Sequence, residues 1–271
     1  MKRCLALLVV CAVLIGGIGC GVVNNVRNEL LQKLIVSGLE GTDANLISCA
    51  VTDTLVTMKL LAPEGSAEVA ARYDFDDDCR ATWDSAAGQF AELSATVTEQ
   101  LRENKFPQEV EIWVINDQKP EEEDFALLIC RGGKIVYSVI NDPSRKGGLM
   151  NPLDNDELRR YLEDLLAGGE MAPLSCTVTD DRVVIKMPAP DGVAGGLSLY
   201  GESDTVKTRW DAAAEKLIQL SELMANETKV KGKGQSAAVW LVSDLDRDVV
   251  LLICENGAVT YNVVDDVEAG Q

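Results

Sequence analysis

The sequence contains no histidine among its 271 residues. This excludes Ser-His-Asp and Cys-His nucleophiles, histidine general bases and histidine metal ligands. Gly-x-Ser-x-Gly, Ser-x-x-Lys, glycine-rich phosphate-loop and Cys-x-x-Cys motifs are also missing. Their absence argues against the common serine hydrolases, phosphate-loop enzymes, thioredoxin-like redox chemistry and zinc ribbons.

Basic residues are scarce as well. The chain has 25 Lys and Arg against 44 Asp and Glu, which gives a formal net charge of −19. A field of this sign repels phosphate backbones, so we expect no nucleic-acid partner. The hydrophobic fraction of 46% and the charged fraction of 25% are ordinary for a globular protein and do not indicate overall disorder.

The N-terminus has the pattern of an export signal. Lys2 and Arg3 precede an apolar run over residues 5–18, as in the basic and hydrophobic regions of signal peptides. The run ends in Ile18-Gly19-Cys20-Gly21, which resembles the lipobox of bacterial lipoprotein precursors; Gly17 departs from that pattern, where the family usually has leucine. The resemblance implies that residues 1–19 are a signal peptide and that Cys20 carries a lipid.

An uncleaved membrane anchor is the alternative interpretation of the same segment. Residues 4–23 form a mostly apolar stretch of 20 residues, just long enough to span a bilayer. Both interpretations place the body of the protein in the cell envelope, outside the cytoplasm and attached to a membrane. Neither says anything about the domains that follow.

The body is a tandem duplication. Residues 48–65 match residues 175–192 at an offset of 127, with 10 identities in 18 positions. Beyond Trp113 the offset falls to 124, where Leu127-Leu128-Ile129-Cys130 matches Leu251-Leu252-Ile253-Cys254. The lost residues fall in a polar loop, where deletions are tolerated. Self-similarity of this extent predicts two homologous domains.

Each copy shows the same order of expected elements: helix, two strands, helix, three strands. This order predicts an α+β domain with a mostly antiparallel sheet and helices on one face. The last two strands are joined by Gly132-Gly133 in one copy and Asn256-Gly257 in the other, which suits a two-residue hairpin turn. The expected domains are 20–142 and 155–271, with a linker at 143–154. In the first copy we expect strands near 46–52, 54–61, 109–116, 124–131 and 134–141, and the longer helix near 80–103.

All four tryptophans are paired between the copies. Trp83 and Trp210 begin the apolar face of the longer helix, so we expect them in the core. Trp113 and Trp240 lie in strands and can face either way. These two are the candidate ligand-binding residues, because an indole ring stacks on sugars or peptides.

The cysteines of the body also recur in pairs. Outside the cytoplasm their positions on the first and fourth strands predict one disulfide per domain, Cys49–Cys130 and Cys176–Cys254. The alternative is four buried thiols, since Cys176 alternates with Val178 and Cys254 ends an apolar run. Cys79 is unmatched and is either a free thiol or an intermolecular link.

The acidic clusters do not predict a metal centre. Asp74, Asp76 and Asp78 have the alternate spacing of a calcium loop, but Cys79 and Ser85 stand where glycine and glutamate are needed. Asp244, Asp246 and Asp248 repeat the spacing in a segment that continues as a strand. We therefore expect an acidic surface, with no metal and no cofactor.

The sequence favours a non-catalytic role in binding or envelope assembly, with an unknown envelope ligand or protein as partner. The alternatives are a carboxylate-dependent extracytoplasmic hydrolase and a cation-binding surface protein. We predict no catalytic residues, because each shared carboxylate has a local structural explanation at a turn, a helix start or a strand end. The shared charged pairs are Asp53/Asp180, Lys59/Lys186, Asp84/Asp211, Asp117/Asp244 and Asp142/Asp266.

Overall fold

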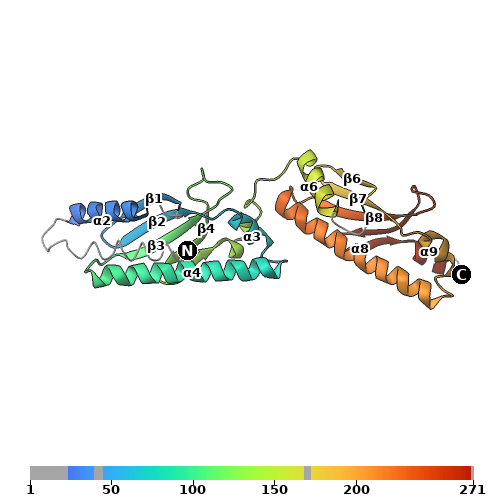
Figure 1. Ribbon diagram of the computed structural model, residues 1–271, viewed down its shortest axis with the longest axis horizontal. Coiled ribbons are helices and arrows are strands. Elements are labelled where there is room, and N and C mark those ends of the chain that lie inside the picture. The colour runs from blue at the N-terminus through green and yellow to red at the C-terminus, as the bar shows by residue number, and fades with distance from the viewer. Residues whose placement is uncertain (1–23, 40–44, 168–171, 270–271) are drawn as a thin grey trace. The chain divides into compact units, whose positions relative to one another are not determined.

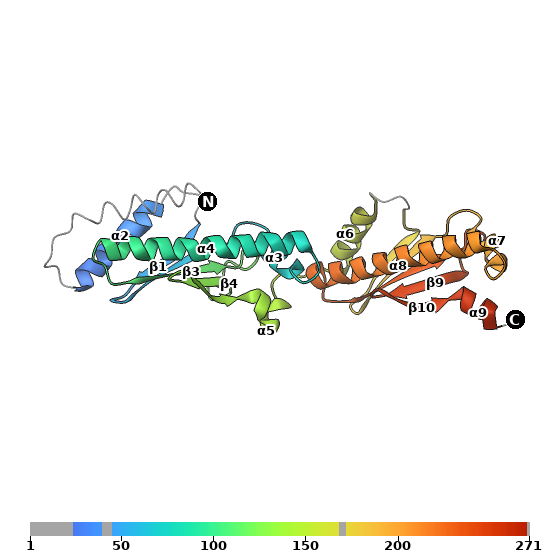
Figure 2. The same cartoon turned by 90° about the horizontal axis from the view of Figure 1, so that it is seen from below.

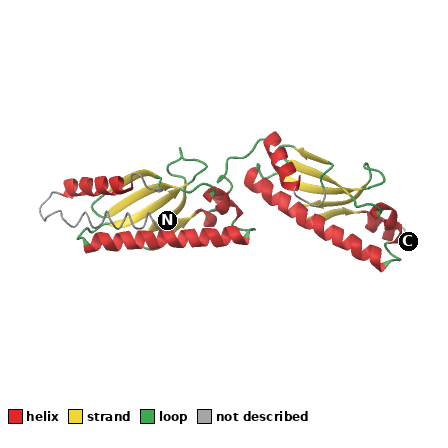
Figure 3. Ribbon diagram, viewed as in Figure 1, coloured by secondary structure: helices red, strands yellow, loops and turns green. Residues whose placement is uncertain are grey.

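The computed structural model describes residues 24–39, 45–167 and 172–269 of the chain (Figure 1). The chain divides into two compact units, Met1–Asn151 and Pro152–Gln271. Both units combine helices with a five-stranded sheet (Figure 3). The predicted tandem α+β architecture is therefore confirmed.

The first unit follows the predicted order of elements, with short helices added. Two of them flank the expected strands: α3 precedes the long helix, and α5 follows the sheet. Its elements are α2 (Asn24–Leu39), β1 (Leu46–Val51), β2 (Leu55–Leu61), α3 (Ser66–Arg72), α4 (Asp77–Glu103), β3 (Glu109–Ile115), β4 (Ala126–Arg131), β5 (Lys134–Ser138), the 3-10 helix η1 (Val139–Asn141) and α5 (Pro143–Lys146).

The second unit repeats this order. Its short helices fall at the equivalent places, and a last helix ends the described chain. Its elements are α6 (Asn155–Ala167), β6 (Ser175–Val178), β7 (Arg182–Pro188), α7 (Val193–Gly196), the 3-10 helix η2 (Leu197–Leu199), α8 (Asp204–Lys231), β8 (Ser236–Val242), β9 (Val250–Glu255), β10 (Ala258–Asn262) and α9 (Val263–Ala269).

The two sheets have the same topology. In the first the strand order is β1-β2-β3-β4-β5, and in the second β6 to β10 follow the same order. The pairs β2–β3 and β7–β8 are parallel, and the other neighbouring pairs are antiparallel. Parallel neighbours need a long crossover, which α4 and α8 supply. The sheets are thus mostly antiparallel, as predicted.

Each sheet has one buried face and one open face. Along β2 the side chains of Val56, Met58 and Leu60 are buried, whereas the alternating Thr57 and Lys59 stay partly exposed, as the two-residue period of a strand requires. The buried side chains share one core with residues of α2 and α4, and both helices lie on that side of the sheet (Figure 2). We call the other side the open face; it carries Thr57, Lys59, Trp113 and Ile129 in the first unit and Val184, Lys186, Trp240 and Ile253 in the second.

Local sequence explains where the long helices begin. Asp76 accepts a hydrogen bond from the Cys79 N–H at 2.9 Å and caps α4, and Ser203 occupies the same place before α8. Such caps satisfy amides that have no partner within the helix. The first-turn residues Asp77 and Asp78 also interact favourably with the helix dipole.

The hairpin between the last two strands has the predicted left-handed turn. The backbone φ angles are 53° and 93° at Gly132 and Gly133, and 51° and 84° at Asn256 and Gly257, as a type I′ turn requires. Ser94 of α4 accepts the Gly133 N–H at 2.9 Å. In the second unit Ser221 of α8 accepts the Gly257 N–H in the same way. Each long helix is therefore hydrogen-bonded to the hairpin turn of its own sheet.

Two predictions about the loops are corrected. Between the second strand and the long helix, where we predicted no helix or strand, the chain forms α3, whose Ala67 and Ala70 are fully buried. The predicted linker 143–154 is too wide: it contains α5, and Leu149 is buried in the first core while its carbonyl accepts a hydrogen bond from Asn116. The units meet between Asn151 and Pro152.

The predicted disulfides are wrong. Cys49, Cys130, Cys176 and Cys254 are all buried free thiols. Cys49 on β1 is separated from Cys130 on β4 by two intervening strands, and the second unit has the same separation. Strands lie about 4.8 Å apart, so the paired Cα atoms are about 14 Å apart, whereas a disulfide needs less than about 7 Å. The buried thiols that we gave as the alternative are present.

The signal segment and Cys20 lie outside the described residues, so the lipoprotein interpretation stays a prediction. Among residues 24–39, 45–167 and 172–269, no helix combines the length and apolar character needed to cross a membrane.

Candidate ligand-binding face

Several of the charged residues that recur in both units have a structural role in each of them. Asp117 and Asp244 follow equivalent strands, and each fixes a loop through hydrogen bonds. Asp117 accepts the N–H groups of Gly65 and Ala67 at 2.9 and 2.8 Å. Asp244 accepts those of Gly192 and Ala194 at 2.7 and 3.2 Å, and these bonds, led by the one from Gly192, lower its pKa. Both carboxylates are engaged by backbone amides.

The other shared carboxylates also have structural partners. Tyr73 donates its hydroxyl to Asp84 at 3.1 Å, and Asn28 donates to Asp53 at 2.8 Å. Tyr137 donates to Asp142 at 3.1 Å. The second unit reproduces all three bonds. They are Tyr200 to Asp211 at 3.1 Å, Asn155 to Asp180 at 3.1 Å and Tyr261 to Asp266 at 3.2 Å.

The acidic clusters considered for calcium are likewise engaged or dispersed. Asp76 caps α4, and Asp74 forms an ion pair with Lys146 at 2.5 Å. Within the residues that the structure describes, no group of three or more Cys, Asp or Glu side chains has the arrangement of a metal site.

Lysine and tryptophan form a matched pair on the open face of each sheet. In the parallel register Lys59 stands opposite Trp113, and Lys186 stands opposite Trp240. The Lys59 Nζ lies 5.3 Å from the centre of the Trp113 ring, and the Lys186 Nζ lies 5.5 Å from the Trp240 ring. At these distances an ammonium group is attracted to the face of an indole.

An aliphatic residue and a tyrosine extend each pair across the sheet. Trp113 stands opposite Ile129, which stands opposite Tyr137 on the next strand. The same row in the second unit is Lys186, Trp240, Ile253 and Tyr261. A row of cation, indole, aliphatic and phenol side chains is thus retained in both copies. We call it the Lys-Trp row.

Charged groups around the Lys-Trp row differ between the units. In the first unit Glu111 accepts the indole N–H of Trp113 at 2.7 Å and forms an ion pair with Arg131. Lys59 also pairs with Asp124 at 2.8 Å, and this contact lowers the Asp124 pKa. At the place of Glu111 the second unit has Ala238, and the Trp240 N–H has no hydrogen-bond partner.

The other two tryptophans belong to the cores, as predicted. Trp83 and Trp210 are 6% and 3% exposed. Their indole N–H groups donate to Ser138 and Asn262, both at 3.2 Å. Trp113 and Trp240, in contrast, are partly exposed on the open face. The strand tryptophans therefore remain the ones available to a ligand.

From the sequence we identified Lys59 and Lys186 as a pair that recurs in both copies, but we did not predict that they lie beside the tryptophans. One signal was present: Lys59 alternates with the apolar Met58 and Leu60, and Trp113 alternates with Ile112 and Val114. Both therefore point away from the core. Their adjacency depends on the parallel pairing of β2 with β3, which links residues 54 positions apart.

The comparisons with known proteins identify no family for this chain. It matches no protein-family model, no curated protein and no solved structure.

Proposed function

We propose that this chain is an exported, membrane-tethered binding protein of the cell envelope. Each of its two units presents the Lys-Trp row to an envelope ligand. The signal-like N-terminus and the lipobox-like Cys20 support the tether outside the cytoplasm. The retained Lys-Trp row supports binding, and it is the observation that carries the proposal.

A non-catalytic role is favoured over a carboxylate-dependent hydrolase. The shared carboxylates accept hydrogen bonds from backbone amides or from tyrosine and asparagine side chains of the same unit. Hydrolysis by two carboxylates needs one of them free to activate water or attack the substrate. The structural partners of these groups oppose that use.

The chemistry of the Lys-Trp row suits a sugar or a peptide. The indole of Trp113 provides a flat apolar surface for stacking, and the ammonium group of Lys59 donates hydrogen bonds to hydroxyl or carboxylate oxygens. Two such rows on one tethered chain raise the effective concentration of the second contact once the first has formed. A polymeric envelope glycan that carries short peptides matches this arrangement.

The test is cosedimentation of the exported body, residues 20–271, with insoluble bacterial cell-wall polymer. We expect the wild-type body to sediment with the polymer. Trp113→Ala or Trp240→Ala alone should weaken binding roughly tenfold or more, through lost avidity, and the double variant should stay in solution. Phe75→Ala, which removes a partly exposed ring away from the open face, should bind as the wild type does.

Unchanged binding by the double variant would contradict the ligand proposal. The tether is checked by expressing the full-length chain in a bacterial host and fractionating the cells. The wild-type chain should be recovered from the membrane fraction with a lipid on Cys20. The Cys20→Ala variant should lose the lipid and leave the membrane fraction. A hydrolytic activity that disappears in Asp117→Ala with Asp244→Ala, while folding is retained, would instead favour the enzyme.

A further inference from the structure

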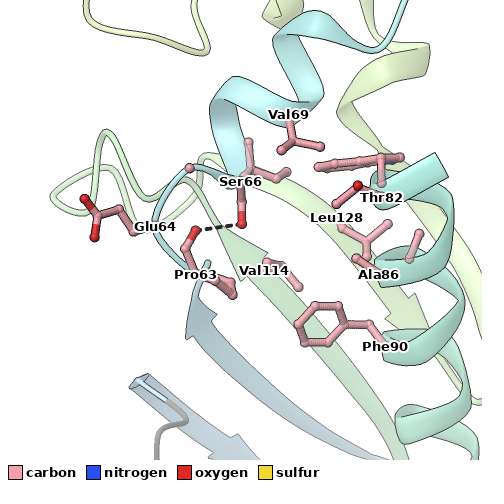
Figure 4. A pocket seen from close by; sticks show the side chains of 13 residues that line it. Pro63, Glu64, Ser66, Val69, Thr82, Ala86, Phe90, Val114 and Leu128 are labelled. Atoms are coloured by element: carbon pink, nitrogen blue, oxygen red, sulfur yellow. Dashed lines mark hydrogen bonds between the residues drawn. The ribbon is translucent and has the colours of Figure 1, made fainter. Parts of the chain in front are cut away.

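The first unit contains an apolar cavity on the helix-covered side of its sheet. It has a volume of about 300 Å³ and lies between the start of α3, the first turns of α4 and the strands β3 and β4 (Figure 4). Its walls include Val69, Trp83, Phe90, Val114 and Leu128. Because the Lys-Trp row lies on the open face, the cavity is a separate feature.

Three of the polar groups in the wall are already engaged. Ser66 donates its hydroxyl to the carbonyl of Pro63 at 2.7 Å (Figure 4). The Trp83 N–H donates to Ser138, and the Gly65 N–H donates to Asp117. A molecule inside therefore meets mainly carbon, and a polar group placed there would lose its hydrogen bonds to water.

Charge further restricts the occupant. Glu64 is the one charged residue that lines the cavity, and no Lys or Arg lines it. The whole chain has a net charge of −19. An anionic head group would meet a carboxylate without a cation to pair with, so an uncharged molecule is favoured over a fatty acid.

The second unit offers a natural comparison. A cavity at the equivalent position, beside Trp210 and Ala213, has a volume of only about 110 Å³. Leu197, which corresponds to Ala70 of the first unit, lines this smaller cavity. No residue of the second sheet contributes to its wall. Arg209 also replaces Thr82. The deep apolar part of the cavity is thus a property of the first unit.

We infer that the first unit binds one small uncharged apolar molecule in this cavity. The volume is about twice that of an apolar cavity of ~150 Å³ that binds benzene in another protein. It also reaches the lower end, about 300 Å³, of the range for ligand pockets. The second cavity falls well below that range, so the stoichiometry is one molecule per chain.

The experiment is calorimetric titration of 1-octanol into residues 24–271, a segment that contains every described residue of both cores. Octanoate, with the same number of carbons and a carboxylate head, is titrated in parallel. Ala86→Phe fills the cavity from α4, and Ala213→Phe makes the same change at the equivalent position of the second unit. We expect saturable binding of one octanol per chain, with octanoate at least tenfold weaker.

Ala86→Phe should abolish octanol binding, and Ala213→Phe should leave it unchanged. Circular dichroism establishes that both variants are folded. If Ala86→Phe does not fold, methyl NMR of the wild type decides: octanol-induced shifts at Val69 and Val114 support the site. Shifts confined to methyl groups outside the cavity wall, equal binding by a folded Ala86→Phe, equal binding of octanoate or absence of saturable binding would each overturn the inference.

Discussion

At the scale of single residues, the cysteines show how burial controls chemistry. Cys49, Cys130, Cys176 and Cys254 face the cores, and burial raises the pKa of each thiol to about 11. The thiolate is the reactive form, so these groups are inert in the folded protein. Cys79 on α4 is partly exposed, although burial and Asp76 raise its pKa as well.

We predict that, among the five cysteines that the structure describes, iodoacetamide at pH 8 labels Cys79 first. The four buried thiols should react only after unfolding, because a pKa of about 11 leaves roughly one thiol in a thousand ionised at this pH. Mass spectrometry of labelled peptides, with and without urea, provides the measurement. Recovery of a Cys49–Cys130 peptide under non-reducing conditions would contradict the fold.

The same thiols make stability depend on alkaline pH. Their folded-state pKa of about 11 lies above the ordinary value of 9.0, so the folded chain retains protons that the unfolded chain releases. Their contribution to stability is complete below pH 9 and is lost as pH rises to 11. Urea denaturation of the unlabelled protein, repeated between pH 8 and pH 11, checks the sign: the free energy of unfolding should fall over this interval.

At the scale of elements, an aspartate after a strand organises the loop that begins a short helix. Gly65 has a φ of 86°, which favours glycine, and Asp117 receives its N–H together with that of Ala67. The second unit repeats the arrangement with Gly192 and Asp244. These bonds give the recurring motif Ala-Pro-Glu-Gly or Ala-Pro-Asp-Gly a structural role in both units.

We therefore predict that Asp117→Ala lowers the free energy of unfolding of the first unit by about 1–2 kcal/mol, as expected when a cap is lost. The free energy of unfolding of Asp117→Asn should lie between those of the wild type and Asp117→Ala, because one carbonyl oxygen remains to accept a hydrogen bond. Urea denaturation measures the effect. Glu121→Ala in an exposed loop is the matched control and should change stability by no more than about 0.5 kcal/mol.

At the scale of the whole molecule, the chain is two complete structures joined in series. Each unit has its own sheet and its own core, and each is of a size that folds alone. Duplication has kept the Lys-Trp row in both, while the apolar cavity is large in one unit only. The copies thus share the Lys-Trp row and differ in the size of the apolar cavity.

We predict that residues 24–151 and 152–271 fold when expressed separately. Each should show cooperative thermal unfolding with an enthalpy of about 80–90 kcal/mol, as expected for a domain of about 120 residues. Differential scanning calorimetry tests this. A non-cooperative transition in either fragment would show that its core is incomplete. Fragments that end at residue 142 or begin at residue 155 serve as the comparison. They lack Leu149 and Leu153, which belong to the first and second cores, and should be less stable.

Local pattern was enough to predict much of the fold. Alternation along 54–61 and the Gly-Gly and Asn-Gly turns predicted strands and a hairpin that the structure confirms. The short helix α3 escaped because seven residues are too few for a clear helical period. The predicted linker 143–154 included Leu149 because burial of this residue is a tertiary contact that no local pattern reveals.

The sequence by itself determined the absence of histidine chemistry, the acidic charge, the duplication and the class of fold, because each is a property of composition or of local period. The tertiary structure alone decided which residues meet. Strand order placed two strands between Cys49 and Cys130 and ruled out their disulfide, while the parallel register set Lys59 against Trp113. Both outcomes depend on pairing between distant segments, and no local pattern encodes which strand becomes the neighbour of another.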